Sequence, residues 1–223
     1  MILDAITAFL YCLGAYAIGS LPTAVWYGQA FFGVDVRDFG SRNAGATNTF
    51  RVLGTKPGII VLFIDAFKGW TATIISYILI HNTNIHEKYI PLYGMLFGAL
   101  AVVGHIFPLF ANFKGGKGVA TLFGMILAVQ PVVAISCVGV FVLVLSFTRY
   151  VSLSSILGAI MLPISVLWIW NEHEITYRVF ALLVAFMVVL THQKNIGRIL
   201  RGVESRIPIL KYRDRRKSRR RTD

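Results

Sequence analysis

Charged residues, and acidic residues above all, are scarce in this sequence. Of its 223 residues only 14% are charged, and 10 Asp and Glu stand against 22 Lys and Arg, which gives a formal net charge of +12. An ordinary soluble domain is about a quarter charged and less apolar than the 56% found here, so a soluble globular protein is close to excluded. Disorder is excluded by the same apolar content. The two cysteines, Cys12 and Cys137, lie in apolar runs and are too few for a disulfide scaffold.

Long apolar runs take the place of the missing charge. They cover 5–32, 58–80, 90–110, 119–147, 156–170 and 179–190. A helix needs about 20 residues to cross a bilayer. The 119–147 run is interrupted near its middle by Gln130 and Pro131, and we expect two segments there because proline removes a backbone donor and clashes with the preceding turn. The sequence therefore predicts an all-α fold, a polytopic membrane helix bundle with seven transmembrane segments.

The loops between these runs orient the bundle. Basic residues mark 33–56, 112–118, 148–150 and the C-terminal tail, whereas 81–89, 130–131 and 171–178 carry little net charge. Seven crossings, with the N-terminus outside and the C-terminus cytoplasmic, place every basic segment in the cytoplasm, as the positive-inside bias requires. Six crossings would leave the first basic loop or the tail outside. Segments 119–129 and 179–190 are short for a full span, so a tilted or re-entrant course is open for either.

The positive charge is concentrated at the C-terminal end. We expect residues 1–203 to form the membrane domain and residues 204–223 to form a basic cytoplasmic tail. A basic run behind a membrane domain is more typical of contact with anionic membrane lipids than of nucleic-acid binding, and Tyr212 alone offers little for base stacking. No nucleic acid and no obligate protein partner are expected.

Four polar clusters, at 40–48, 113–118, 150–155 and 191–195, all fall on the predicted cytoplasmic side. The second contains Lys114, Gly115, Gly116, Lys117 and Gly118. This composition suits an anion cradle, because glycines let backbone N–H groups approach an oxyanion while lysines and a following helix N-terminus add positive potential. It is not a Walker A loop, since no Ser or Thr follows Lys117. A flexible basic loop is the plainer alternative.

The first cluster offers hydroxyl, amide and guanidinium groups. They come from Ser41, Asn43, Thr47, Asn48 and the following Arg51. Such donors suit a phosphate or a polyol. An ordinary polar turn with a helix N-cap at Ser41 or Asn43 is an equally open interpretation.

Two pairs of polar residues have helical i, i+3 spacing. His192 and Asn195 would share a face if the last span continues as one helix, where an imidazole could take a hydroxyl proton and an amide could orient the reacting group. An interfacial histidine is the plainer alternative. Asp65 and Lys68 are charged residues inside an apolar run, and mutual pairing is their simplest explanation. No Cys, His and carboxylate set has metal-ligand spacing, so no metal is expected.

The ordered motifs resemble those of one known family. They lie at 19–23, 40–51, 65–69, 104–108, 113–121, 150–155 and 192–204, nearly everything before the tail. Together they are similar to the acyl-phosphate-dependent glycerol-3-phosphate acyltransferases of the bacterial inner membrane, the PlsY family. The resemblance implies transfer of a fatty acyl group from acyl phosphate to the 1-hydroxyl of sn-glycerol 3-phosphate, giving lysophosphatidic acid and inorganic phosphate. It also implies seven spans and a site that faces the cytoplasm.

The resemblance also implies roles for single residues. It assigns Ser41, Asn43 and Arg51 to a first motif, Lys114 to Lys117 to a phosphate-binding second, His192, Asn195 and Glu204 to a third, and Ser155 to a further site hydroxyl. We interpret His192 and Asn195 as catalytic and the others as substrate-binding. Three features depart from the family pattern: Arg42 stands where Gly is common, Gln193 where Arg or Lys usually follows the histidine, and the Arg-rich tail is extra.

The expected chemistry needs positioning more than a reactive cofactor. An acyl phosphate is a mixed anhydride with a good leaving group, so holding two phosphorylated substrates in register is the main task, and no cofactor is expected. We expect direct attack by the acceptor hydroxyl, with His192 or a substrate phosphate oxygen as the base. One alternative is a serine-type acyltransferase that uses Ser41 or Ser155 with His192. Another is a transporter of an organic phosphate, although polar groups at one face and the lack of an internal repeat count against it.

Overall fold

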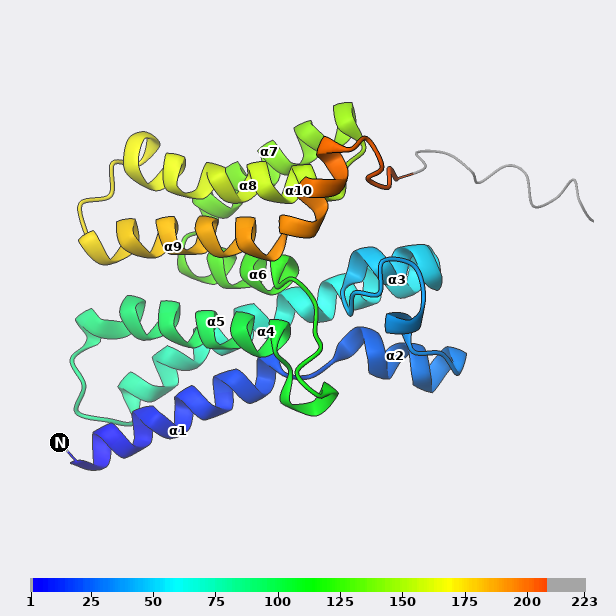
Figure 1. Ribbon diagram of the computed structural model, residues 1–223. Helices are drawn as coiled ribbons and strands as arrows, with labels where there is room; N and C mark the ends of the chain where they lie inside the picture. The colour runs from blue at the N-terminus through cyan, green and yellow to red at the C-terminus, as the bar shows by residue number, and fades with distance from the viewer. Residues whose placement is uncertain (1, 208–223) are drawn as a thin grey trace, which may run out of the picture.

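The computed structural model describes residues 2–207, and these residues form helices and no strand (Figure 1). The α-helices are α1 (Ile2–Gly19), α2 (Thr23–Phe32), α3 (Ala46–Val52), α4 (Thr55–His81), α5 (Ile90–Ile106), α6 (Val119–Val129), α7 (Pro131–Thr148), α8 (Val151–Ile164), α9 (Ile175–Thr191) and α10 (Gln193–Leu200). Short 3₁₀ turns lie at Val36–Asp38, Glu87–Tyr89 and Leu109–Ala111, and a π-helical turn at Ser165–Ile169 extends α8. The all-α prediction is confirmed.

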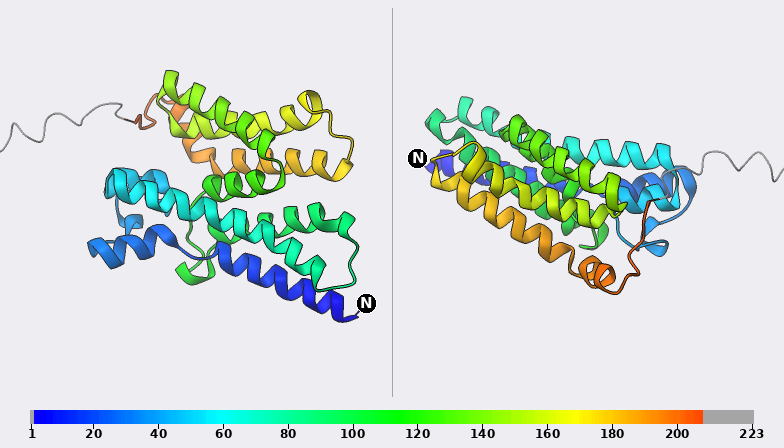
Figure 2. Two further views of the ribbon diagram at one scale, coloured as in Figure 1. Left: turned by 180° about the vertical axis from the view of Figure 1, so that it is seen from behind. Right: turned by 90° about the horizontal axis from the view of Figure 1, so that it is seen from above.

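The long helices form two packed halves (Figures 1 and 2). In the first half α4 packs against α1, α5 and α6, and in the second half α8 packs between α7 and α9. Helix α6 joins the halves, because its buried Leu122, Met125 and Ile126 share one apolar cluster with residues of α7, α8 and α9. The loop before α6, helix α10 and the start of α8 lie at one end of the bundle, which we call the site end, and the N-terminus lies at the other.

Length and composition identify five helical segments that can each cross a bilayer, within the described part of the chain. They are Ile2–Gly19, Thr55–His81, Glu87–Ala111, Pro131–Thr148 and Val151–Ile169, and a sixth is obtained if α9 and α10, which meet at a 59° bend, count as one span. With 11 residues, α6 is about 16 Å long. Many large apolar side chains on the outer faces are exposed, among them Phe63 and Phe147, as a lipid-facing surface requires. Seven crossings and the sidedness of the termini stay predictions.

Two prolines decide where apolar runs are divided. The expected break at Gln130 and Pro131 is confirmed, because α6 ends at Val129 and α7 begins at Pro131. The 5–32 run, which we expected to form a single first span, is instead two helices with Pro22 between them. Proline cannot continue the hydrogen-bond ladder of α1. The Gly19 and Leu21 carbonyls at this break accept hydrogen bonds from the ammonium of Lys68, at 3.3 Å for Gly19 and 2.7 Å for Leu21.

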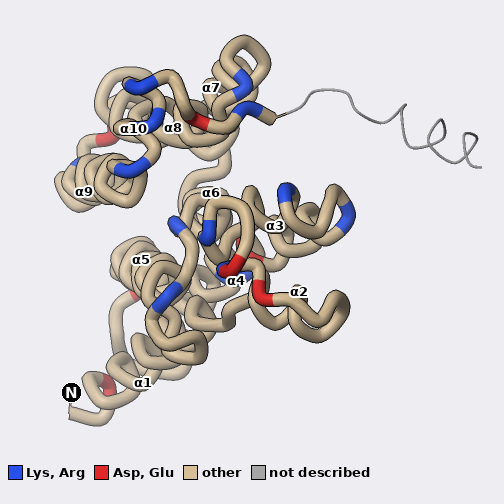
Figure 3. Tube along the Cα trace, turned by 45° about the vertical axis from the view of Figure 1, so that its right-hand side comes forward, with Lys and Arg blue, Asp and Glu red and all other residues tan. Residues whose placement is uncertain are grey.

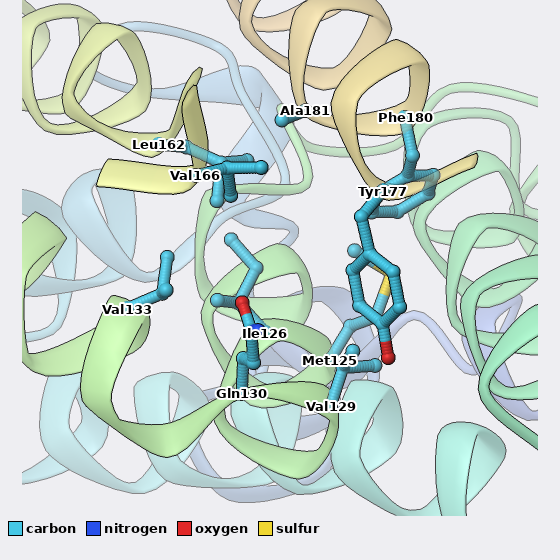
Figure 4. Close-up of a pocket in the computed structure, with 10 residues that line it drawn as sticks. All are labelled: Met125, Ile126, Val129, Gln130, Val133, Leu162, Val166, Tyr177, Phe180 and Ala181. Carbon is cyan, nitrogen blue, oxygen red and sulfur yellow. The ribbon is translucent and has the colours of Figure 1, made fainter. Parts of the chain in front are cut away.

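A small cavity lies where α6 meets α7, α8 and α9 (Figure 4). Its volume is about 20 Å³, the space of roughly one water molecule. The lining is almost wholly apolar, with the side chains of Gln130 and Tyr177 as its polar members. It lies near the C-terminal end of α6, whereas Lys117 precedes the N-terminal end of that helix. This cavity therefore does not contain the predicted site.

Candidate active site

The polar clusters predicted from the sequence converge at the site end of the bundle. Figure 3 shows lysine and arginine gathered on α3, α10 and the connecting loops, while the long helices carry few. The side chains that meet come from the loop before α6, from α8, from α10 and from the segment after α10. Because these elements belong to both halves of the bundle, the site forms only when the halves pack together.

Glu204 is the centre of this arrangement. Its Oε1 accepts hydrogen bonds from Asn195 Nδ2 and from Ser152 Oγ, both at 2.7 Å, and its Oε2 accepts one from Arg198 Nε at 2.6 Å. Burial alone would raise the pKa of Glu204, but the hydrogen bonds from these three donors hold it below its ordinary value. The carboxylate thus stays ionised and fixes three side chains. We call Glu204, Asn195, Ser152, Arg198 and Lys117 the Glu204 network.

Lys117 joins the network through Asn195. Its ammonium donates to Asn195 Oδ1, so the amide of Asn195 is held at both ends. Burial lowers the pKa of Lys117 to about 8; attraction by Glu204 opposes this shift, and repulsion by Arg198 and Arg51 adds to it. A cation that is partly desolvated and surrounded by further positive charge is well suited to hold an anion.

His192 lies beside the network, at a break between α9 and α10. It is only 2% exposed, and its Nδ1 lies 2.8 Å from the carbonyl oxygen of Val188. A carbonyl can only accept, so Nδ1 carries the hydrogen and Nε2 of the neutral ring is left with a free lone pair. This tautomer leaves Nε2 able to accept a proton.

The last span does not continue as one helix through His192 and Asn195, so the condition for a shared helix face is not met. The carbonyl of Val188 is occupied by the side chains of Thr191, at 2.9 Å, and His192, and the His192 amide turns to the carbonyl of Val189 instead. Such side-chain hydrogen bonds compete with the helical ladder, and the chain bends by 59° into α10. Both His192, at the break, and Asn195, in the first turn of α10, are nevertheless buried at the same end of the bundle.

The glycine and lysine loop differs in detail from the expected anion cradle. The amides of Gly115 and Gly116 donate to the carbonyls of Ile106 and His105, at 3.2 and 3.1 Å, so they are not available to an oxyanion. The glycines are needed here for close packing: a methyl group on Gly116 would overlap the His105 ring. Lys117 and Gly118 follow, and Gly118 adopts φ +77° at the start of α6. Substrate contact by Gly115 and Gly116 stays a prediction.

The first polar cluster is built around Asn48. Its Nδ2 donates to the carbonyls of Val36, at 2.7 Å, and Phe39, at 3.1 Å, and its Oδ1 accepts from the amide of Ser41 at 2.8 Å and from the Ser41 hydroxyl at 3.2 Å. Both polar atoms of the Asn48 side chain are therefore used to hold the backbone of residues 36–41. The alternative of an N-cap at Ser41 or Asn43 is wrong, because α3 begins at Ala46 with Gly45 as its N-cap.

The first loop lies against the glycine and lysine loop. Gly45 approaches the Cα of Gly116, and Arg37 donates to the carbonyls of Ala111 and Lys114, at 3.0 and 3.4 Å. Arg51, in the last turn of α3, is exposed and close enough to Lys117 to lower its pKa. Arg42 adopts φ +59°, the left-handed region that glycine enters most readily, at the position where the resemblance leads us to expect Gly.

Not every predicted residue joins the Glu204 network. Lys114 is exposed, Asn43 and Thr47 are partly exposed, and the Ser155 hydroxyl donates to the Val151 carbonyl of its own helix at 2.9 Å. Neither Ser41 nor Ser155 contacts His192 through a hydrogen bond in residues 2–207. Sequence reasoning does not single out Ser152 or Arg198. Ser152 lies within the polar cluster at 150–155, whereas Arg198 carries no separate signal.

These observations define an all-helical membrane protein with a buried, hydrogen-bonded polar site at one end of the bundle. The family described as "Glycerol-3-phosphate acyltransferase" matches residues 9–202, and the chain belongs to that family. Among the relatives of this name, one from Fusobacterium nucleatum subsp. nucleatum is 42% identical over 89% of this chain and 97% of its own length, and one from Listeria monocytogenes serotype 4a is 43% identical over 91% and 98%.

Two solved structures have the same fold. Both are crystal structures of PlsY (YgiH), an integral membrane glycerol 3-phosphate acyltransferase, one in a glycerol 3-phosphate form and one in a lysophosphatidic acid form. The first aligns with a TM-score of 0.78 at 34% identity over 90% of this chain and 96% of its own. The second aligns with a TM-score of 0.75 at 33% identity over 90% and 95%. The resemblance noted in the motifs is thereby confirmed.

Proposed function

We propose that this protein transfers a fatty acyl group from acyl phosphate to the 1-hydroxyl of sn-glycerol 3-phosphate, giving lysophosphatidic acid and inorganic phosphate. The observation that supports this most is the Lys117, Asn195 and Glu204 chain of hydrogen bonds beside the buried His192. It provides a cation, an oriented amide and a base at one point. The acceptor and the product are those in the titles of the two similar structures; the donor rests on the resemblance of the motifs.

The proposed reaction is a direct attack. The acceptor oxygen forms a bond with the acyl carbon, the bond from that carbon to the phosphate oxygen breaks, and the phosphate leaves with the electron pair. The hydroxyl proton passes to Nε2 of His192 or to a substrate phosphate oxygen. Asn195 orients the reacting groups, while Lys117 and Arg51 neutralise phosphate charge as it develops.

The geometry favours this path over a serine nucleophile. A serine nucleophile needs a base within hydrogen-bonding reach, and the hydroxyls of Ser41 and Ser155 are directed instead to Asn48 and Val151. We place the protein in the bacterial inner membrane, with seven crossings and the site end facing the cytoplasm. Acyl chains would then lie between helices and remain open to lipid.

An assay of the detergent-purified protein tests the proposal. Palmitoyl phosphate and glycerol 3-phosphate are supplied together, phosphate release and lysophosphatidic acid are both followed, and palmitoyl-CoA serves as the alternative donor. Product from acyl phosphate alone is expected. Phosphate release without acylated glycerol phosphate would indicate a hydrolase or another acceptor. Absence of turnover with both donors, together with uptake of glycerol phosphate into proteoliposomes, would favour a transporter.

A further inference from the structure

A second group of ionisable side chains lies inside the first half of the bundle, outside the proposed reaction. Asp65, Lys68 and His105 are 1%, 4% and 7% exposed. Lys68 Nζ lies 2.8 Å from Asp65 Oδ1, and His105 Nδ1 lies 3.6 Å from the same oxygen. The expected pairing of Asp65 with Lys68 is confirmed. We call these three residues the sealed cluster. Charges inside a membrane bundle are costly and usually serve a function.

The sealed cluster touches two backbone segments that shape the site end. Lys68 donates to the carbonyls of Gly19 and Leu21 at the break between α1 and α2. The side chain of His105 lies directly against Gly116, so closely that the three atoms nearest to an added Cβ there all belong to the His105 ring. Gly116 immediately precedes Lys117. A rigid contact therefore joins the sealed cluster to the residue before the proposed phosphate-binding lysine.

We propose that Asp65, Lys68 and His105 are positioning residues that set the direction of Lys117 through the contact between His105 and Gly116. This inference rests on the proposed function of Lys117. The Lys68 ammonium holds Asp65, the Asp65 carboxylate holds the His105 ring, and the ring forms the surface on which Gly116 packs. The hydrogen bonds from the Gly115 and Gly116 amides to the carbonyls at the end of α5 fix which loop residues face that helix end. The His105 ring sets how closely the loop approaches α5. A displacement of about 1 Å at such a site can reduce turnover about 100-fold.

A double-mutant cycle between Gly116 and His105 tests this contact. Gly116→Ala forces a methyl group into the ring, and we expect kcat to fall about 100-fold. His105→Ala removes the ring, and we expect a fall of about 10-fold because the loop is less well held. In the double variant the methyl group occupies the space of the ring, so kcat should return to within about threefold of His105→Ala alone, which is strong coupling.

Two glycines provide matched controls. A methyl group on Gly115 would meet the backbone carbonyl of His105, which no change of the His105 side chain removes, so His105→Ala should not rescue Gly115→Ala. Gly139 in α7 has open space around its Cβ position, and Gly139→Ala should leave kcat unchanged. Rescue at Gly116 together with failure at Gly115 is the pattern that the proposal requires.

A further background separates positioning from a purely structural role. If the sealed cluster acts through Lys117, His105→Ala should lower the residual kcat of Lys117→Ala by less than about twofold. A purely structural role would instead lower activity by the same factor in the wild-type and Lys117→Ala backgrounds, in proportion to the loss of folded protein measured by thermal unfolding. His105→Asn, which keeps a polar group facing Asp65, replaces His105→Ala in the cycle if the alanine variant fails to fold.

The outcomes distinguish this inference from the proposed function. Near-normal turnover of Lys117→Ala would contradict the proposed role of Lys117 itself. If Lys117→Ala is inactive but Gly116→Ala and His105→Ala, or His105→Asn, combine additively, the inference is overturned and the proposed function stands. Equal rescue of Gly115→Ala and Gly116→Ala would also overturn it, because the effect would then not pass through the ring.

Discussion

The sealed cluster and the Glu204 network both place charges in the interior of the bundle, but they differ in access. Asp65, Lys68 and His105 are each at most 7% exposed. In the Glu204 network, by contrast, the Arg198 side chain is 35% exposed and Lys117 is partly exposed. The second group is therefore open to solvent and the first is not. Burial of charged side chains alone therefore does not identify an active site. Some of these side chains must also be accessible from solvent.

The two groups also differ in where their members come from. The sealed cluster lies on two neighbouring helices of one half, α4 and α5, with the remaining donors of Lys68 directed to the backbone. The Glu204 network draws on a loop of the first half and on α8, α10 and residue 204 of the second. The first arrangement stiffens one half, whereas the second depends on how the halves meet. This difference predicts that substitutions in the sealed cluster lower stability and, through Gly116, also turnover, whereas those in the network lower turnover with little loss of stability.

The largest expected effect is on stability, from Asp65→Asn. It leaves the buried ammonium of Lys68 without its counter-charge, and breaking a buried pair in this way costs about 3 to 5 kcal/mol. Thermal unfolding in detergent, followed by circular dichroism, measures the loss. Asp65→Asn combined with Lys68→Met removes both charges and should recover much of the stability. An unfolding temperature unchanged in Asp65→Asn would contradict the idea that this cluster is a sealed ion pair.

The next effect concerns turnover, from Lys117→Ala. Loss of a preorganised cation at developing phosphate charge should lower kcat about 100- to 1000-fold, with little change in unfolding temperature because the lysine is partly exposed. Steady-state rates with both substrates varied test this. Lys56→Ala, an exposed lysine in the first turn of α4, is the control for removal of a positive charge. Equal losses of kcat in the two variants would mean that Lys117 contributes only to the overall positive charge of the site end.

Much of the sealed cluster and of the Glu204 network could be predicted from the sequence, because the sequence patterns that indicate them are local. The i, i+3 spacing of Asp65 and Lys68 indicates their pairing, and the Gln130 and Pro131 pair indicates the break between α6 and α7. The clustering of polar residues near 113–118 and 191–195 indicates that Lys117, His192 and Asn195 belong to one end. Each of these inferences needs only helix geometry or charge bias.

What was missed depends on contacts between distant segments. The sequence does not show that the carbonyls at the end of α5 occupy the amides of Gly115 and Gly116, nor that Asn48 uses its whole side chain to shape its own loop. The bend at His192 depends on competition for one carbonyl, with no glycine or proline to mark it. The break at Pro22 was visible as a proline but was hidden by the apolar residues on both sides.

A smaller change in the network, Glu204→Gln, tests whether its charge matters as well as its shape. Glutamine can still accept from Asn195, but its amide would face the donor of Arg198. Losing one charge-assisted hydrogen bond at a partly exposed arginine should lower kcat/KM about 10- to 30-fold. Kinetics of the single variant and of Glu204→Gln with Arg198→Gln measure this. If the second change restores most of the rate, the loss is due to the unpaired arginine.

The pH dependence of kcat/KM tests the charge of Lys117 in the unmodified protein. Lys117, with its pKa lowered to about 8, is mostly protonated at pH 7 and mostly neutral at pH 9. If the charged form holds the substrate phosphate, as we propose, kcat/KM should fall about 10-fold over this range, because that parameter reports the free enzyme. Lys117→Arg should remove the fall, since a guanidinium stays charged, whatever its absolute rate. A fall of the same steepness in Lys117→Arg would assign it to another group.

The smallest expected effect, from Ser155→Ala, tests whether a serine takes part covalently. The Ser155 hydroxyl donates to the Val151 carbonyl of α8 and contributes at most one neutral hydrogen bond to a substrate, so kcat/KM should fall by about fivefold or less. A covalent nucleophile would instead cost activity on the scale of Lys117→Ala. Rapid-quench mixing with radiolabelled palmitoyl phosphate, without acceptor, is the companion measurement. Label that stays on the denatured wild-type protein and is absent from Ser155→Ala would overturn direct attack. Absence of label from both proteins agrees with the proposed direct attack, in which Lys117, Asn195 and His192 act on the substrates without a covalent intermediate.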